Sequence, residues 1–120
     1  MNPAVKKAIE TRDALVKLLR KFKLFNEDFC LEINVYDFTT SVKNELKTKA
    51  GFKLRGGDLW SEPAPTSKDL EKLMKNIKKL TGLKIEYDID TSFCYPICFF
   101  SLDDLNKLHD IVYLTARMYN

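Results

Sequence analysis

Residues 66–100 decide the fold class; they read TSKDLEKLMKNIKKLTGLKIEYDIDTSFCYPICFF. Residues 67–81 carry apolar side chains at the i, i+3, i+4, i+7 spacing of one helix face, and Gly82 follows as a helix stop. These apolar positions are Leu70, Leu73, Met74, Ile77 and Leu80. Residues 83–90 then alternate apolar and charged side chains, which is typical of a half-buried strand, and residues 93–100 are apolar on both sides. The stretch therefore predicts one helix followed by two strands.

Short signals mark the ends of these elements. Thr66 and Asp69, or Ser67 alone, supply an N-cap for the helix, and the run of residues 90–92 predicts a turn between the two strands. Pro96 has no N–H to donate to a neighbouring strand, so we expect an edge position or a bulge at this point of residues 93–100.

The N-terminal half predicts two further helices around a strand. Residues 3–24 have a helical apolar stripe, with Pro3 in the first turn, and residues 29–36 alternate like a strand. Residues 41–50 follow possible caps at Thr39, Thr40 and Ser41 and precede Gly51, so they predict a short helix.

Residues 52–66 form the least regular stretch, in which Gly56-Gly57 predicts a tight turn between two short strands around Leu54 and Leu59. At the other end, Ser101 with Asp104 is a capping box for a helix over residues 102–118. The predicted order is α-β-α-(ββ)-α-β-β-α.

This order predicts a single compact α+β domain over residues 1–120. The expected sheet is small and mainly antiparallel, with three to five strands and with helices mainly on one face. A chain of 120 residues, 45% of them hydrophobic, is long enough to bury a core. The uncovered face of the sheet is expected to be polar, with Glu32, Asn34, Tyr36, Lys84, Glu86 and Asp88.

Charge and cysteine usage indicate the compartment and the class of partner. The net charge of +3 combines +6 over residues 1–82 with −3 over residues 83–120. Sixteen of the 20 cations are Lys, which speaks mildly against base reading and is typical of AT-rich genomes such as those of many phages and mobile elements. Three cysteines and no apolar signal-peptide core after Met1 predict a reducing, cytoplasmic location without a membrane span.

No arrangement typical of an enzyme or a cofactor site emerges from the sequence. The single histidine, His109, would pair with Cys94 or Cys98 only by a coincidence of folding, and the cysteines are too scattered for a zinc site. Asp88, Asp90, Asp103 and Asp104 have structural roles on a strand and in a first helical turn, so a Mg²⁺ nuclease is a weak alternative. We expect no enzyme activity, no cofactor and no metal.

One surface feature stands out. Lys68, Lys72, Lys75 and Lys79 recur at i, i+4, i+7 and i+11, so they share the helix face opposite the leucines. This face is a solvated surface, a contact for an acidic protein or a contact for a phosphate backbone. No alternation of basic and aromatic residues along the chain, of the kind that binds single strands, accompanies it.

The first and last predicted helices each have a second apolar flank, which predicts either deeper burial or a surface for self-association or a partner. The flank residues are Val5, Ile9, Val16, Ile111, Leu114 and Met118. We therefore expect a binding protein of the inhibitor, adaptor or immunity type, with a nucleic-acid-binding accessory protein as the alternative. The candidate binding residues are Lys68, Lys72, Lys75, Lys79, Arg55, Trp60, Tyr36 and Glu86.

Overall fold

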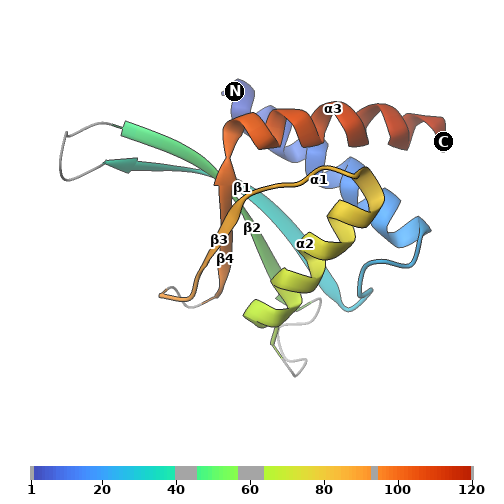
Figure 1. The fold of residues 1–120 in the computed structure, drawn as a ribbon, viewed down its shortest axis with the longest axis horizontal. Helices are drawn as coiled ribbons and strands as arrows, with labels where there is room; N and C mark the ends of the chain where they lie inside the picture. The colour runs from blue at the N-terminus through green and yellow to red at the C-terminus, as the bar shows by residue number, and fades with distance from the viewer. Residues whose placement is uncertain (1, 40–45, 57–63, 93–94, 120) are drawn as a thin grey trace.

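The computed structural model describes residues 2–39, 46–56, 64–92 and 95–119, and the described part is a three-helix α+β domain (Figure 1). Its elements are α1 (Pro3–Lys21), β1 (Phe29–Thr39), β2 (Leu46–Gly56), α2 (Ser67–Thr81), β3 (Tyr87–Asp90), β4 (Ile97–Ser101) and α3 (Leu102–Met118). The described strands form one antiparallel sheet in the order β1-β2-β4-β3. The predicted α+β class is therefore confirmed.

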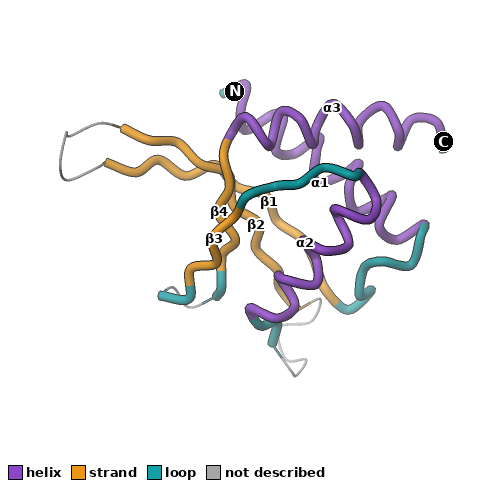
Figure 2. The backbone as a smooth tube through the Cα atoms, in the orientation of Figure 1, coloured by secondary structure: helices purple, strands orange, loops and turns teal. Residues whose placement is uncertain are grey.

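The strands of the sheet differ in length, and this shapes the molecule. β1 and β2 pair along their full eleven residues, from Phe29 opposite Gly56 to Thr39 opposite Leu46. β4 covers β2 only from Lys49 to Lys53, because the chain turns into α3 after Ser101. The β1–β2 ribbon consequently projects beyond the rest of the sheet, as the arm on the left of Figure 2 shows.

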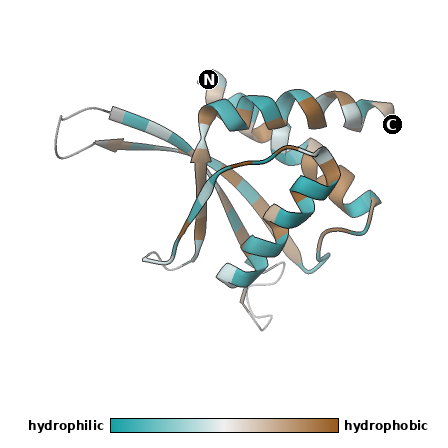
Figure 3. Ribbon diagram, viewed as in Figure 1, coloured by the Kyte–Doolittle hydropathy of each residue, from teal (hydrophilic) through white to brown (hydrophobic). Residues whose placement is uncertain are grey.

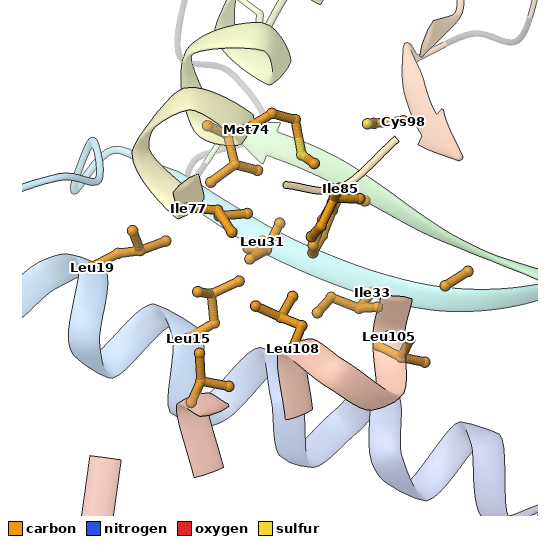
Figure 4. Close-up of a cluster of buried hydrophobic side chains, with 14 of the residues drawn as sticks. Leu15, Leu19, Leu31, Ile33, Met74, Ile77, Ile85, Cys98, Leu105 and Leu108 are labelled. Carbon is orange, nitrogen blue, oxygen red and sulfur yellow. The ribbon is translucent and has the colours of Figure 1, made fainter. Parts of the chain in front are cut away.

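The core lies between the three helices and one face of the sheet. Leu15 and Leu19 of α1, Leu31 of β1 and Leu108 of α3 are buried in one cluster, which Figure 4 shows in close-up. Phe52 of β2 and Phe100 of β4 stack on each other at 4.5 Å within it, which fixes the two central strands against the helices. Because all three helices pack on this side, the other face of the sheet is left without a helix, and period-2 alternation sends every second strand residue to that face.

The prediction of a helix over residues 41–50 is wrong where the structure describes it. Residues 46–50 belong to β2, which runs through Gly51 without ending there. Within β2, cationic and apolar residues alternate. Burial of Ala50, Phe52 and Leu54 against the helices favours the strand over the helix that the caps and Gly51 indicate. Leu54 lies in this long strand instead of a short one. Residues 41–45, Gly57 and Leu59 lie outside the described residues.

Several element positions also differ from the prediction. β1 continues to Thr39 instead of residue 36, and β4 begins at Ile97 instead of residue 93. α1 ends at Lys21 instead of residue 24, because Lys23 takes a left-handed backbone (φ 56°). β3 begins only at Tyr87, since residues 82–86 have no regular structure. Pro96 is neither on an edge strand nor in a bulge: it lies just before the internal strand β4, so its missing N–H falls outside the paired residues.

The predicted helices over 67–81 and 102–118 are confirmed with their caps. Asp69 accepts hydrogen bonds from the backbone N–H and the hydroxyl of Thr66, and the Ser101 hydroxyl accepts one from the N–H of Asp104. Gly82 ends α2 in the left-handed conformation that glycine adopts without strain. Within the described residues, no helix is long and apolar enough to cross a membrane.

Candidate binding surfaces

An aromatic cluster covers the helix-free face of the sheet. Tyr36 and Phe38 of β1 and Phe99 of β4 lie on this face, and we call them the open-face cluster. The ring of Phe99 meets those of Tyr36 and Phe38 edge-to-face, at centroid distances of 5.2 and 5.3 Å. Phe99 is only 8% exposed and its neighbour Ile97 only 6%, yet neither belongs to the main core. The open face thus has a small apolar centre of its own.

Gly51 makes this packing possible. It lies opposite both Asn34 of β1 and Phe99 of β4. A Cβ atom at this position would lie 2.7 Å from Cε2 of Tyr36 and 2.9 Å from Cγ2 of Ile97, which is closer than non-bonded carbon atoms approach each other in proteins. The absence of a side chain lets the Tyr36 ring lie across β2.

Charges of both signs surround the open-face cluster. β2 contributes Lys47, Lys49, Lys53 and Arg55. Arg55 forms an ion pair with Glu32 at 3.3 Å, and the Lys53 ammonium lies 4.7 Å from the centre of the Tyr95 ring. On the other side of β4, Asp90 and Asp88 face the same way, because they pair with Ile97 and Phe99. Four cations and three carboxylates leave the open face close to neutral.

Two adjoining hollows lie beside the open-face cluster, where β1 and β2 extend past β4. The smaller, about 360 Å³, is bounded by Phe38, Phe99, Lys47, Lys49, Asp88 and Asp90. The larger, about 610 Å³, shares four of these residues and continues to Glu86, Tyr87 and Asp104. Burial raises the pKa of Tyr87, with Cys98 and Glu71 adding to the effect, so this phenol stays neutral at physiological pH.

The lysine stripe predicted on the helix 67–81 lies on the exposed side of α2. Among the described residues, no carboxylate comes within 4.0 Å of the ammonium group of Lys68, Lys72, Lys75 or Lys79. Most of the α2 ribbon is coloured as hydrophilic in Figure 3. The helix packs its leucines on the covered side of the sheet, so the stripe and the open face are two separate surfaces.

The predicted binding residues are therefore divided between these surfaces. Tyr36 and Arg55 lie on the open face and Glu86 borders its larger hollow, whereas the four lysines lie on α2. Trp60 lies outside the described residues. Of the predicted polar residues of the open face, Lys84 and Glu86 fall in the irregular stretch before β3 instead of on a strand.

Phe38, Phe99 and the lysines of β2 are functional candidates that the sequence pattern did not indicate. Basic and aromatic residues do not alternate along the chain, but strand pairing brings them together in space: Lys49 is opposite Tyr36 and Lys47 is opposite Phe38. The signal that predicts it is the alternation of cations over residues 47–55, which is hidden once residues 41–50 are read as a helix.

The groups with catalytic potential occupy packing positions. His109 stacks on Tyr113 at 5.0 Å. Its two ring nitrogens are buried with no hydrogen-bond partner in the described part of the chain, and each lies 3.7 Å from a carboxylate oxygen, Nε2 from Glu10 and Nδ1 from Asp110. Burial raises the pKa of Cys98 to about 12, with a smaller contribution from Asp88, so its nucleophilic thiolate is scarce at neutral pH.

Cys98 is a buried, free thiol, whereas Cys94 lies outside the described residues. No group of three metal-ligating side chains occurs in the described parts of the chain. Comparisons of this chain with protein-family models, with curated proteins and with solved structures find no match.

Proposed function

We propose that this chain is a small non-enzymatic binding protein of the inhibitor, adaptor or immunity type, and that it binds another protein through its open face. The observation that carries the proposal is the open-face cluster itself, in which aromatic rings remain accessible on a sheet face that no helix covers. Phe38 is 36% exposed and Tyr95, beside the cluster, is 41% exposed. Partly exposed aromatic side chains are the residues that most often supply binding energy at protein interfaces.

The balance of charge on the open face favours a protein over a nucleic acid. A protein surface that binds nucleic acid gains affinity by neutralising phosphates, and this requires a clear excess of cations on that surface. Here Arg55 is already paired with Glu32, and Asp88 and Asp90 stand on the far side of β4. An apolar centre inside a rim of both signs is the typical composition of a protein interface.

The alternative, a nucleic-acid-binding accessory protein, is favoured by a different observation. The four lysines of α2 are exposed and, among the described residues, none of them lies within ion-pair distance of a carboxylate. Such a stripe can follow a phosphate backbone. Because α2 and the open face are separate surfaces, one experiment distinguishes the two functions.

The experiment places a photo-crosslinking residue, p-benzoylphenylalanine, at position 38 in one variant and at position 75 in a second, and irradiates each in an extract of the source cells. We expect position 38 to crosslink to one defined protein, and an excess of unlabelled wild type to suppress the product. A Phe38→Ser, Lys49→Glu competitor should suppress it far less, because its open face is altered. Nucleic acid crosslinked from position 75, with nothing crosslinked from position 38, would contradict the proposal and support the alternative.

A further inference from the structure

A third surface, separate from the open face, is a groove between α2 and the segment that joins α1 to β1. Its volume is about 500 Å³, within the range of small-molecule sites, roughly 300–1,000 Å³. Its lining includes three lysines, Lys23, Lys72 and Lys79, and the apolar side chains of Phe29, Leu54 and Leu73. We call it the basic groove. Cations therefore border an apolar floor.

The wall of the basic groove is held by hydrogen bonds. The side-chain amide of Asn76, which is nearly buried, donates from Nδ2 to the carbonyl oxygen of Leu24 at 2.8 Å. The N–H of Leu24 donates to the carbonyl of Leu19 at 2.7 Å, and the left-handed backbone of Lys23 turns the chain between these contacts. These contacts tie the segment that carries Lys23 to both α1 and α2, so the groove exists before a ligand binds.

Within the described residues, the three lysines of the basic groove outnumber the carboxylates of its lining and form no ion pair. The one carboxylate of the lining, that of Asp69, accepts the N–H of Thr66 at 2.7 Å and its hydroxyl at 3.1 Å, and so serves as the cap of α2. In the described part of the chain, no carboxylate lies within 4.0 Å of Lys23, Lys72 or Lys79.

We propose that the basic groove binds a small organic anion, with a phosphate or carboxylate group among the three lysines and an aromatic or aliphatic body on Phe29, Leu54 and Leu73. The lysines attract the anion from a distance, and the apolar floor removes the body of the ligand from water. An anion without an apolar body gains only the screened attraction of exposed ammonium groups, so it binds more weakly.

The test is an NMR titration of the ¹⁵N-labelled chain with phenyl phosphate, 3-phenylpropionate and inorganic phosphate. We expect phenyl phosphate to shift the side-chain amide of Asn76 and the backbone amides of Leu54 and Leu73. Inorganic phosphate should shift them only at much higher concentration. The ratio of affinities for phenyl phosphate and 3-phenylpropionate identifies which anionic group the lysines prefer.

Two matched double variants locate the charges that matter. Lys72→Gln with Lys79→Gln should weaken phenyl phosphate binding by about tenfold, which corresponds to about 1.4 kcal/mol, since two of the three charges that attract the anion are removed. Lys68→Gln with Lys75→Gln removes the same charge from the same helix face but not from the groove lining, and should change the affinity by less than about twofold. Gln keeps the helix propensity of Lys, so both variants fold.

Three results would overturn the proposal. One is equal weakening in both double variants, which indicates a diffuse basic surface. The second is equal binding of phenyl phosphate and inorganic phosphate, which excludes a contact with the floor. The third is the absence of any shift at Asn76, Leu54 and Leu73 at about 10 mM phenyl phosphate, a concentration at which a fragment of this size is detected in a real site. None of these results bears on the open face.

Discussion

Gly51 is the residue on which the open-face cluster depends, so replacing it tests the cluster directly. In Gly51→Ala the new methyl group would overlap the Tyr36 ring and the Ile97 side chain. We expect overpacking of about 1–3 kcal/mol, which lowers Tm by roughly 5–15 °C in a thermal melt. In a Tyr36→Ser background the same substitution should cost less, because the ring is gone. An equal loss in both backgrounds would show that the ring does not limit the space at Gly51.

Replacing Thr11 should raise stability, whereas replacing Gly51 should lower it, because Thr11 places an unsatisfied hydroxyl in the core. Its side chain is 0% exposed, and its hydroxyl has no hydrogen-bond partner among the residues that the structure describes. Thr11→Val keeps the shape and removes the unsatisfied group, so it should raise the free energy of unfolding by about 1 kcal/mol. Urea denaturation measures this change as a higher midpoint at an unchanged slope.

Thr115→Val is the matched control for Thr11→Val. The Thr115 hydroxyl donates to the carbonyl of Ile111 at 2.7 Å, so its removal also removes a hydrogen bond. We expect no gain in stability from this second substitution. A gain of the same size in both variants would mean that valine is simply favoured in these helices.

The buried thiol of Cys98 should make the free energy of unfolding depend on pH in the alkaline range. Burial raises its pKa from 9.0 to about 12, so the folded chain keeps this proton at pH values where the unfolded chain loses it. The contribution of Cys98 is therefore complete below pH 9 and declines as the pH rises from about 9 to 12, by up to about 1.4 kcal/mol per pH unit. Because the pKa of Tyr87 is raised as well, the comparison is with Cys98→Ala. Urea midpoints at increasing pH should fall more steeply for wild type than for this variant.

At the scale of elements, the helices α2 and α3 could be predicted and β2 could not. Helical periodicity and capping boxes are local, since each involves residues three or four positions apart. The first half of β2 has few apolar residues, and its strand conformation depends on pairing with β1, whose last residue, Thr39, lies seven positions before Leu46, where β2 begins. In the sequence, Gly51 resembles the stop of a helix. Its actual role is to leave room for the Tyr36 ring, and this role appears only when β1 and β2 are paired.

The second apolar flanks of α1 and α3 differ in how far they are buried. Val16 packs against the core, which accounts for part of the α1 flank. On α3, Leu114 is 63% exposed and Met118 is 81% exposed, so this end of the helix is a candidate surface for self-association. We expect Leu114→Asp with Met118→Asp to leave Tm within about 2 °C of wild type, since exposed side chains contribute little to stability.

Sedimentation equilibrium tests the same variant for assembly. The average mass of wild type should rise with concentration, and that of the double Asp variant should stay at the monomer value. A wild type that remains monomeric at every concentration, or a variant that assembles equally well, would exclude this end of α3 as the contact. The first outcome would leave the open face as the main apolar surface for a partner.

At the scale of the whole molecule, the candidate site was harder to predict than the fold. The class follows from residues 66–100 alone, because a helix and two strands in that order already require a mixed domain. The open-face cluster instead combines Tyr36 and Phe38 with Phe99, more than sixty positions away, and needs the register of three strands to form. The lysine stripe is local to α2, which is why the sequence predicted it.

The distribution of charge over the whole molecule leads to the last prediction. Residues 1–82 carry a net charge of +6 and residues 83–120 one of −3, so a polyanion would be attracted to the first part of the chain, which includes the lysine stripe of α2. Four or five phosphate contacts weaken with salt at a log–log slope of roughly −3 to −4 for duplex DNA. We therefore expect no measurable affinity of wild type for random duplex or single-stranded DNA in fluorescence anisotropy at about 150 mM salt.

The variant with Gln at positions 68, 72, 75 and 79 completes this measurement. It should fold like wild type, because Gln and Lys have similar helix propensities and all four positions are exposed. Micromolar binding of DNA by wild type, abolished in this variant, would contradict the proposed protein partner and favour the nucleic-acid function. If neither chain binds DNA and both are crosslinked equally to one protein from position 38, binding depends on the open face and the stripe on α2 is a solvated surface. The molecule would then have two separate surfaces: the lysine stripe of α2, which is only hydrated, and the open face, where aromatic rings inside a nearly balanced set of charges bind the partner.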